Sequence, residues 1–311
     1  MAITAAMVKE LRELSGAGMM DCKKALNETN GNMDEAMEFL RKNGQAKAEK
    51  KASRIAAEGI VKVAVDGATA AIVEVNSETD FVAKNEKFQT YVEKVANQAL
   101  ATNAADMDAF MEEAWVEDNA KTVKDVLVEQ VAVIGENLKI RRFEKVTAEN
   151  GCVVDYIHGG GRIGVVVVAE TATVNDTVTE AMKNIAMQIA ALNPKYVDRS
   201  EVSAEFIEHE KEILKAQIMN DPKESQKPEK VINGMIEGRI SKELKEICLV
   251  DQVYVKAEDG KQTVAKYLEA VSKEVGTTVS VKKFIRFETG EGLEKKNEDF
   301  AAEVAAQMAG N

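Results

Sequence analysis

The chain has 311 residues, about twice the ~150 residues of a typical domain, so we expect more than one folded unit. Hydrophobic residues make up 45% of it and charged residues 30%, a balance that is typical of globular proteins and argues against a disordered chain. The formal net charge of −12 disfavours general binding to nucleic acid and to anionic membrane surfaces, because both are themselves negatively charged.

Cysteine and histidine are scarce, which limits the chemistry that the chain can support. The three cysteines, Cys22, Cys152 and Cys248, lie far apart, so we expect no disulfide framework and a reducing compartment. Of the two histidines, His158 and His209, neither lies in an HExxH pattern, so no zinc site and no other cofactor are expected. No apolar run approaches the ~20 residues of a membrane helix and no signal-peptide pattern is present, which together predict a cytoplasmic protein.

Residues 1–54 are expected to form a first domain of three short helices with a linker. Apolar residues recur there at helical spacing, and glycine- or asparagine-containing breaks separate the three runs. Thr4 is predicted to cap the first helix, and Asn32 or Asp34 the third. The run 42–54, rich in Lys and Ala, is expected to be an exposed helical linker.

Residues 55–148 and 149–288 predict two copies of one α+β unit. Each copy begins with a strand hairpin, whose turn contains Gly67 or Gly159, continues with helices and closes on a strand. The offset between equivalent positions grows from 92 residues at these turns to 141 residues at the glycines that follow the last helix of each copy. The second copy therefore contains an insertion.

The insertion, at about 193–247, is predicted to be an antiparallel helical hairpin. It holds or borders all three prolines, and two runs with apolar residues at helical spacing flank a polar loop. Such a projection is expected to expose an apolar flank unless a partner covers it. Residues 289–311 predict a C-terminal helical module, in which Phe300, Val304 and Met308 share one face.

The segment Asn76–Lys84 is the first candidate site. Thr79 or Asp80 can cap a helix that starts near Phe81. The pattern alone favours Phe81 as a staple or core residue of that helix. The alternative is an aromatic side chain presented at the surface beside a carboxylate, which would anchor an interface.

Two further motifs have a structural and a functional interpretation. The glycines of His158–Arg162 free backbone N–H groups that can cradle a phosphate, but the segment joins two strands and matches no known phosphate-binding motif. We therefore favour a hairpin turn. Met19 and Met20 are expected in the core, although methionine also suits adaptable binding surfaces.

Five segments follow one another along almost the whole chain: Leu11–Leu26, Asn76–Asn85, Ile134–Asn137, His158–Gly159 with Arg162–Val165, and Ile285–Glu288 with Gly290–Gly292. Together they resemble the elongation factor Ts family, while residues 102–121 carry no motif of that family. The resemblance implies a ubiquitin-associated-like three-helix domain, a duplicated α+β core with antiparallel sheets, an inserted antiparallel helical hairpin and a C-terminal helix.

The resemblance also implies a function: guanine nucleotide exchange on elongation factor Tu, without covalent chemistry. Such a protein binds the GDP-bound and nucleotide-free forms of its partner, and a Thr-Asp-Phe loop disturbs the partner's Mg²⁺ and phosphate site. By this likeness Thr79, Asp80, Phe81 and Val82 displace the Mg²⁺ of the partner. The residues implied in partner binding are Leu11, Met19, Met20, Lys23, Thr79, Asp80, Phe81, Val82, Ile134, Gly135, His158 and Gly159.

Two alternatives stay open at the level of the sequence. One is a small-molecule enzyme that uses His158 and the glycines after it. The other is an adaptor that binds its partner without speeding nucleotide release. The sequence leaves self-association open as well.

Overall fold

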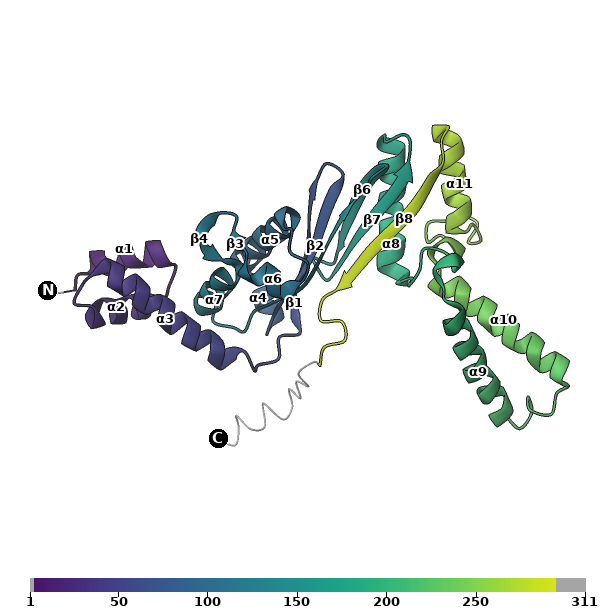
Figure 1. The fold of residues 1–311 in the computed structure, drawn as a ribbon, viewed down its shortest axis with the longest axis horizontal. Helices are drawn as coiled ribbons and strands as arrows, with labels where there is room; N and C mark the ends of the chain where they lie inside the picture. The colour runs from purple at the N-terminus through teal and green to yellow at the C-terminus, as the bar shows by residue number, and fades with distance from the viewer. Residues whose placement is uncertain (1–2, 295–311) are drawn as a thin grey trace.

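The computed structural model describes residues 3–294 of the chain. The molecule is elongated, and the N-terminal helices, the β-sheets with their covering helices and a projecting helical hairpin follow one another along it (Figure 1). Helices and antiparallel sheets together confirm the α+β class. The predicted C-terminal helix falls on residues 295–311, which lie outside the described part of the chain.

The N-terminal helices form a small bundle: α1 (Ala5–Ser15), α2 (Met19–Glu28) and α3 (Met33–Lys51). The Thr4 side chain accepts a 3.3 Å hydrogen bond from the Met7 N–H and so caps α1, as predicted. The Asn32 side chain, rather than Asp34, caps α3. Leu11 and Leu26 are fully buried in the bundle core.

The predicted linker belongs to α3, which runs without a break to Lys51. The expectation that this stretch is simply exposed is wrong at Gly44, which is buried against Ala132 of α7 (Val123–Ile134). Arg41, one turn earlier, pairs with Asp125 of α7 at 2.9 Å. The helix therefore packs against the core, because the glycine lets α3 and α7 approach closely and the ion pair adds a second contact.

Each copy of the predicted repeat forms an antiparallel sheet in which a hairpin is joined by the closing strand. The sheets have the strand orders β1-β2-β5 and β6-β7-β8, and in both the middle strand carries an irregularity where it pairs with the closing strand. This shared connectivity confirms the duplicated α+β core. The strands are β1 (Glu58–Asp66), β2 (Thr69–Ser77), β5 (Lys139–Thr147), β6 (Gly151–His158), β7 (Ile163–Thr171) and β8 (Val279–Glu288).

The two sheets pack face to face and each is covered on its outer face by helices. Ile72, Val166 and Phe287 are among the buried residues between the sheets. Helix α5 (Glu86–Ala101) covers the first sheet, with α7 in the same apolar core, and α8 (Asp176–Leu192) and α11 (Val264–Val275) cover the second (Figure 1).

The short helix α4 (Asp80–Ala83) agrees with the helix predicted near Phe81, but the other short elements escaped prediction from the sequence. A helix of one or two turns or a two-residue strand is too brief to display a hydrophobic period. Trp115, on one of these strands, stacks on Tyr91 of α5 and completes the first core. The elements that escaped prediction are α6 (Met107–Glu112), β3 (Ala114–Trp115), β4 (Asp118–Thr122) and the 3₁₀ turns η1 (Arg199–Glu201) and η2 (Leu249–Asp251).

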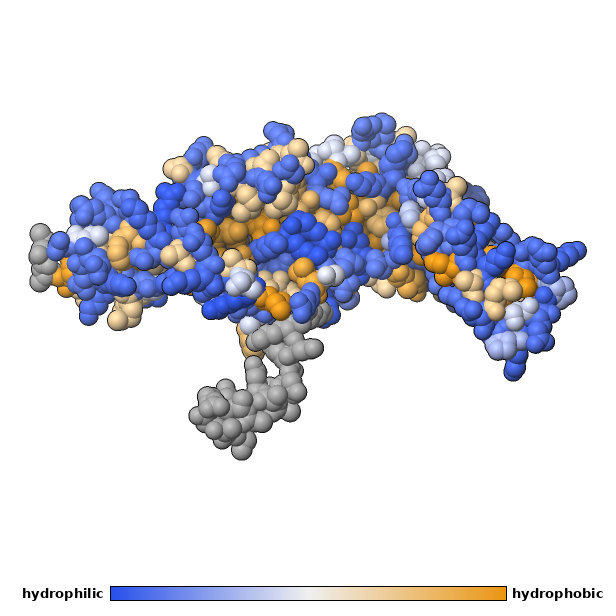
Figure 2. Space-filling model, turned by 60° about the horizontal axis from the view of Figure 1, so that its bottom comes forward, coloured by the Kyte–Doolittle hydropathy of each residue, from blue (hydrophilic) through white to orange (hydrophobic). Residues whose placement is uncertain are grey.

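The insertion forms the predicted antiparallel hairpin of α9 (Ala204–Asn220) and α10 (Glu229–Ile247), which projects from the second repeat (Figure 1). The hairpin has its own apolar core, and the Lys195 and Tyr196 N–H groups donate to the Ile247 carbonyl at its base. Hydrophobic surface is visible on the hairpin (Figure 2). The exposed apolar side chains there are Ile213, Met219 and Val231.

Candidate functional site

The loop that follows β2 begins with a helix cap at Thr79. Its hydroxyl accepts a hydrogen bond from the Val82 N–H at 3.3 Å, so Thr79 rather than Asp80 is the cap. The resulting helix, α4, has a single turn, after which Asn85 caps α5 separately.

Phe81 lies on the outer side of this turn, with 80% of its surface exposed. The prediction that it is a staple or core residue is therefore wrong. Ala83 is the buried residue of α4, and Phe88, in the first turn of α5, fills the adjacent core and is fully buried. One helical turn cannot bury both of its sides, and the sequence pattern alone did not decide which side faces inward.

A carboxylate from another part of the chain holds the loop. Glu136 follows α7, and its Oε2 accepts hydrogen bonds from the N–H groups of Glu78 and Thr79, both at 3.1 Å. Its Oε1 accepts a 2.7 Å hydrogen bond from the Thr79 hydroxyl. In return, Glu78 Oε1 accepts a 2.6 Å hydrogen bond from the Asn137 N–H. We call the set Glu78, Thr79, Glu136 and Asn137 the loop clamp.

Sequence reasoning missed the role of the clamp carboxylates. Glu78 and Glu136 both lie in segments that match the family, but nothing in either segment shows that it pairs with the other. The clamp also explains why the structure brings the Ile134–Gly135 segment next to the Thr79–Val82 loop, since Glu136 connects them.

The loop clamp and the neighbouring Gly135 also contact the end of helix α3 and the residues that follow it. The ammonium group of Lys51, the last residue of α3, donates to the Gly135 carbonyl, and Asn137 Nδ2 donates to the Arg54 carbonyl at 2.8 Å. Arg54 also pairs with Glu78 at 3.4 Å. Burial, together with the charge of Arg54, lowers the pKa of Lys51.

Asp80 is exposed beside Phe81 and is held in its charged form. Its carboxylate forms a 2.6 Å ion pair with Lys84, one turn further on. The hydrogen bond from Lys84 lowers the pKa of Asp80 below its ordinary value. The loop therefore presents an aromatic ring and a negative charge side by side.

The N-terminal candidates divide between the surface and the core. Met19 and Met20 are 58% and 74% exposed, so the prediction that they belong to the core is wrong. They lie in the first turn of α2, and Cys22, Ala25 and Leu26 supply its buried side instead. Lys23 is exposed as well. Leu11 is fully buried, so its side chain supports the bundle from within rather than reaching a partner.

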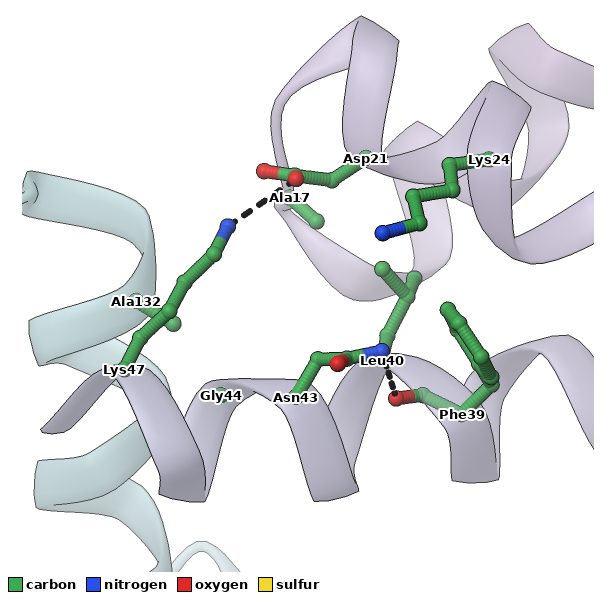
Figure 3. Close-up of a pocket in the computed structure, with 9 residues that line it drawn as sticks. All are labelled: Ala17, Asp21, Lys24, Phe39, Leu40, Asn43, Gly44, Lys47 and Ala132. Carbon is green, nitrogen blue, oxygen red and sulfur yellow. Dashed lines mark hydrogen bonds and ion pairs between the residues drawn. The ribbon is translucent and has the colours of Figure 1, made fainter. Parts of the chain in front are cut away.

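A small pocket lies beside this surface, between α2, α3 and α7 (Figure 3). Lys47 and Asp21 form a 2.9 Å ion pair across it, and Ala132 of α7 contributes to its wall (Figure 3). Its volume is about 80 Å³, well short of the ~300 Å³ of a typical small-molecule site.

The glycine-rich segment is a hairpin turn that packs against the first repeat. The Gly161 carbonyl accepts a 2.7 Å hydrogen bond from the Val61 N–H, and a side chain at Gly161 would come within 2.8 Å of Ile60. Glycine is favoured at this position because a Cβ would crowd the Ile60 side chain and because the φ of Gly161 is +104°, which agrees with the interpretation as a hairpin turn. His158 and Gly159 are exposed, and His158 Nδ1 lies 3.0 Å from the Tyr156 hydroxyl.

The described residues form neither a metal centre nor a membrane-spanning helix. Between residues 3 and 294, no group of three or more His, Cys, Asp or Glu side chains is placed to hold a metal ion. In the same range, no helix is both long and apolar enough to span a membrane.

Comparison with known proteins points to one family. The family model for Elongation factor TS matches residues 78–291. Elongation factor Ts of Clostridium tetani (strain Massachusetts / E88) is 51% identical over 308 residues, which cover 98% of this chain and 99% of the relative. Elongation factor Ts of Clostridium novyi (strain NT) is 50% identical and that of Clostridioides difficile (strain 630) 51% identical, each with the same coverage.

Proposed function

Because this chain belongs to the elongation factor Ts family, we propose that it acts in translation as the guanine nucleotide exchange factor of elongation factor Tu. It binds elongation factor Tu that carries GDP, releases the GDP and stays bound until GTP enters. This work takes place in the cytoplasm and involves no covalent chemistry.

The exposure of Phe81 is the observation that carries the proposal. An aromatic side chain that is 80% exposed on a loop with a fixed backbone has little role in the stability of its own chain. Aromatic anchors of this kind dominate the binding energy of many interfaces. We assign Thr79, Asp80, Phe81 and Val82 to displacement of the Mg²⁺ of the partner.

The other proposed partner contacts lie outside this loop. We assign Met19, Met20 and Lys23 to a second contact surface on the N-terminal helices. Methionine side chains adapt to irregular apolar surfaces, which suits their exposure at this position. We assign a third group of contacts to helix ends and turns of the core, namely the exposed Gly135, His158 and Gly159 and the half-buried Ile134.

Thermodynamic linkage explains how binding alone releases a nucleotide. A factor that binds the nucleotide-free partner more tightly than the GDP-bound partner must weaken GDP binding by the same factor. No bond of the nucleotide is broken, so neither an acid-base pair nor a resident metal is needed.

Release of labelled GDP from elongation factor Tu tests the proposal. With unlabelled nucleotide in excess, the release rate should rise with the concentration of this chain, and the Phe81→Ala variant should raise it much less. Binding to elongation factor Tu without faster release would support a plain adaptor instead. Neither binding nor faster release would overturn the assignment altogether.

A further inference from the structure

The direction in which Phe81 points is not set by its own side chain. With 80% of its surface exposed, the ring makes few contacts within the chain. Helix α4, which carries it, has one turn, and a single turn is far below the length at which a helix is stable by itself. Whatever fixes the orientation of Phe81 must therefore act on the backbone of the loop.

Glu136 is placed to do this. Its carboxylate accepts the N–H groups of Glu78 and Thr79, the two residues that lead into α4. It also accepts the hydrogen of the Thr79 hydroxyl, which leaves the oxygen of that hydroxyl free to accept the Val82 N–H. Thr79 is thus hydrogen-bonded both to Glu136 and to the first turn of α4, and it connects the two. We propose that Glu136 is the positioning residue of the loop and fixes the direction in which Phe81 is presented.

The geometry favours a carboxylate with the reach of glutamate. Three donors converge on the two oxygens of Glu136, and a carboxylate offers acceptors only. Glutamine would keep one oxygen for the two N–H groups, but its NH₂ group would face the Thr79 hydroxyl, which would then have to accept a hydrogen bond instead of donating one. Aspartate is one methylene shorter. Hydrogen bonds to a charged acceptor are also about twice as strong as those between neutral groups.

A fixed loop makes binding more efficient, since less conformational freedom is lost when the partner is engaged. This inference rests on the proposed exchange function, and it adds that the loop is ordered before the partner arrives. Loss of the Glu136 carboxylate should therefore reduce the efficiency of exchange about tenfold, without a comparable change in the global fold.

The first arm of the test needs no partner. In the Glu136→Gln variant, hydrogen exchange of the amides of residues 78–83 should become clearly faster than in the parent chain, while the strands of the first sheet keep their protection. Glu93→Gln, which removes an exposed carboxylate from α5 in the same repeat, serves as the control and should change neither. Unchanged protection of residues 78–83 in Glu136→Gln would overturn the proposal.

The second arm asks whether Glu136 acts through Phe81. Glu136→Gln should slow GDP release in the parent chain but have almost no further effect in a Phe81→Ala chain, because the residue that it positions is gone. When Glu136→Gln is combined with Met20→Ala instead, the changes in free energy that the two substitutions cause in GDP release should add. Equal effects in both backgrounds would indicate a general structural role and sink the proposal.

The two arms also separate this inference from the proposed function. A parent chain that fails to speed GDP release would overturn the exchange function. Faster amide exchange at residues 78–83 in Glu136→Gln would then still support the positioning role.

Discussion

The backbone N–H of Gly290 donates a 2.8 Å hydrogen bond to the carboxylate of Glu74, which is fully buried. Arg141 and Arg142 also donate to this carboxylate, at 3.0 and 2.6 Å. The guanidinium of Arg142 lies 4.1 Å from the centre of the Phe287 ring. The end of the second repeat is thus fastened to the middle strand of the first sheet through one carboxylate.

Gly290→Ala should weaken this attachment. Gly290 has a φ of +71°, which costs about 1–2 kcal/mol for a residue with a side chain, and a Cβ there would collide with the Ala57 carbonyl. Gly292 has a similar φ of +73° but open space around it, so Gly292→Ala is the matched control. Denaturant melts should show a clearly larger loss of stability for Gly290→Ala; equal losses would contradict a close contact.

Glu74→Gln should destabilise the chain by about 2–4 kcal/mol at neutral pH, because it leaves the two arginines without their buried partner. The expected loss is below that of a fully buried pair, since Arg141 and Arg142 are partly exposed to water. The free energy of unfolding from denaturant melts measures it. A change below about 0.5 kcal/mol would mean that the cluster contributes little.

The same carboxylate should shape the response to acid. Burial alone would raise the pKa of Glu74, but hydrogen bonds from Gly290, Asn76 and Arg141 and the charge of Arg142 hold it below its ordinary value of 4.5. A lowered pKa contributes stability that is present above pH 4.5 and is lost as the pH falls through the folded-state value. The stability difference between the parent and Glu74→Gln should therefore shrink between pH 5 and about pH 3. A constant difference in melts across this range would contradict the assignment.

Phe81→Ala should leave stability within about 1 kcal/mol of the parent, since an exposed ring has little burial to lose. Phe88→Ala, seven residues away, removes a fully buried ring and should cost about 3–5 kcal/mol. When equal amounts of folded protein are compared, Phe81→Ala should slow GDP release from elongation factor Tu more than Phe88→Ala does. A Phe81→Ala chain that is badly destabilised but exchanges normally would restore the core interpretation.

Replacement of residues 198–246 by a short Gly-Ser linker should leave both repeats folded. The hairpin packs around its own apolar cluster, and the backbone hydrogen bonds at its base, from Lys195 and Tyr196 to Ile247, lie outside the replaced segment. Circular dichroism should show less helix and unchanged strand content, with a cooperative melt. Loss of the cooperative melt would show that the hairpin is part of the core.

Much of the fold was open to prediction because its signals are local. Short-range patterns predict the caps at Thr4 and Asn32 and the two helices of the hairpin, because the side chains involved lie within a few residues of one another. The repeat is visible because two sheets with one connectivity need similar turns and similar strands. The short elements between α5 and α7 carry too few residues to show a period, and for that reason they were missed.

The α+β class, the duplication, the hairpin and the segments that match the family can all be recognised in the amino-acid sequence. The outward orientation of Phe81, Met19 and Met20 cannot, because burial depends on what packs against a helix and not on the helix pattern alone. The folded structure is also needed to show that Glu136 binds Thr79, 57 residues away, and that Glu74 binds Gly290, 216 residues away. Such pairs are brought together by the packing of sheets and helices, and the sequence around either residue does not show which distant residue it contacts.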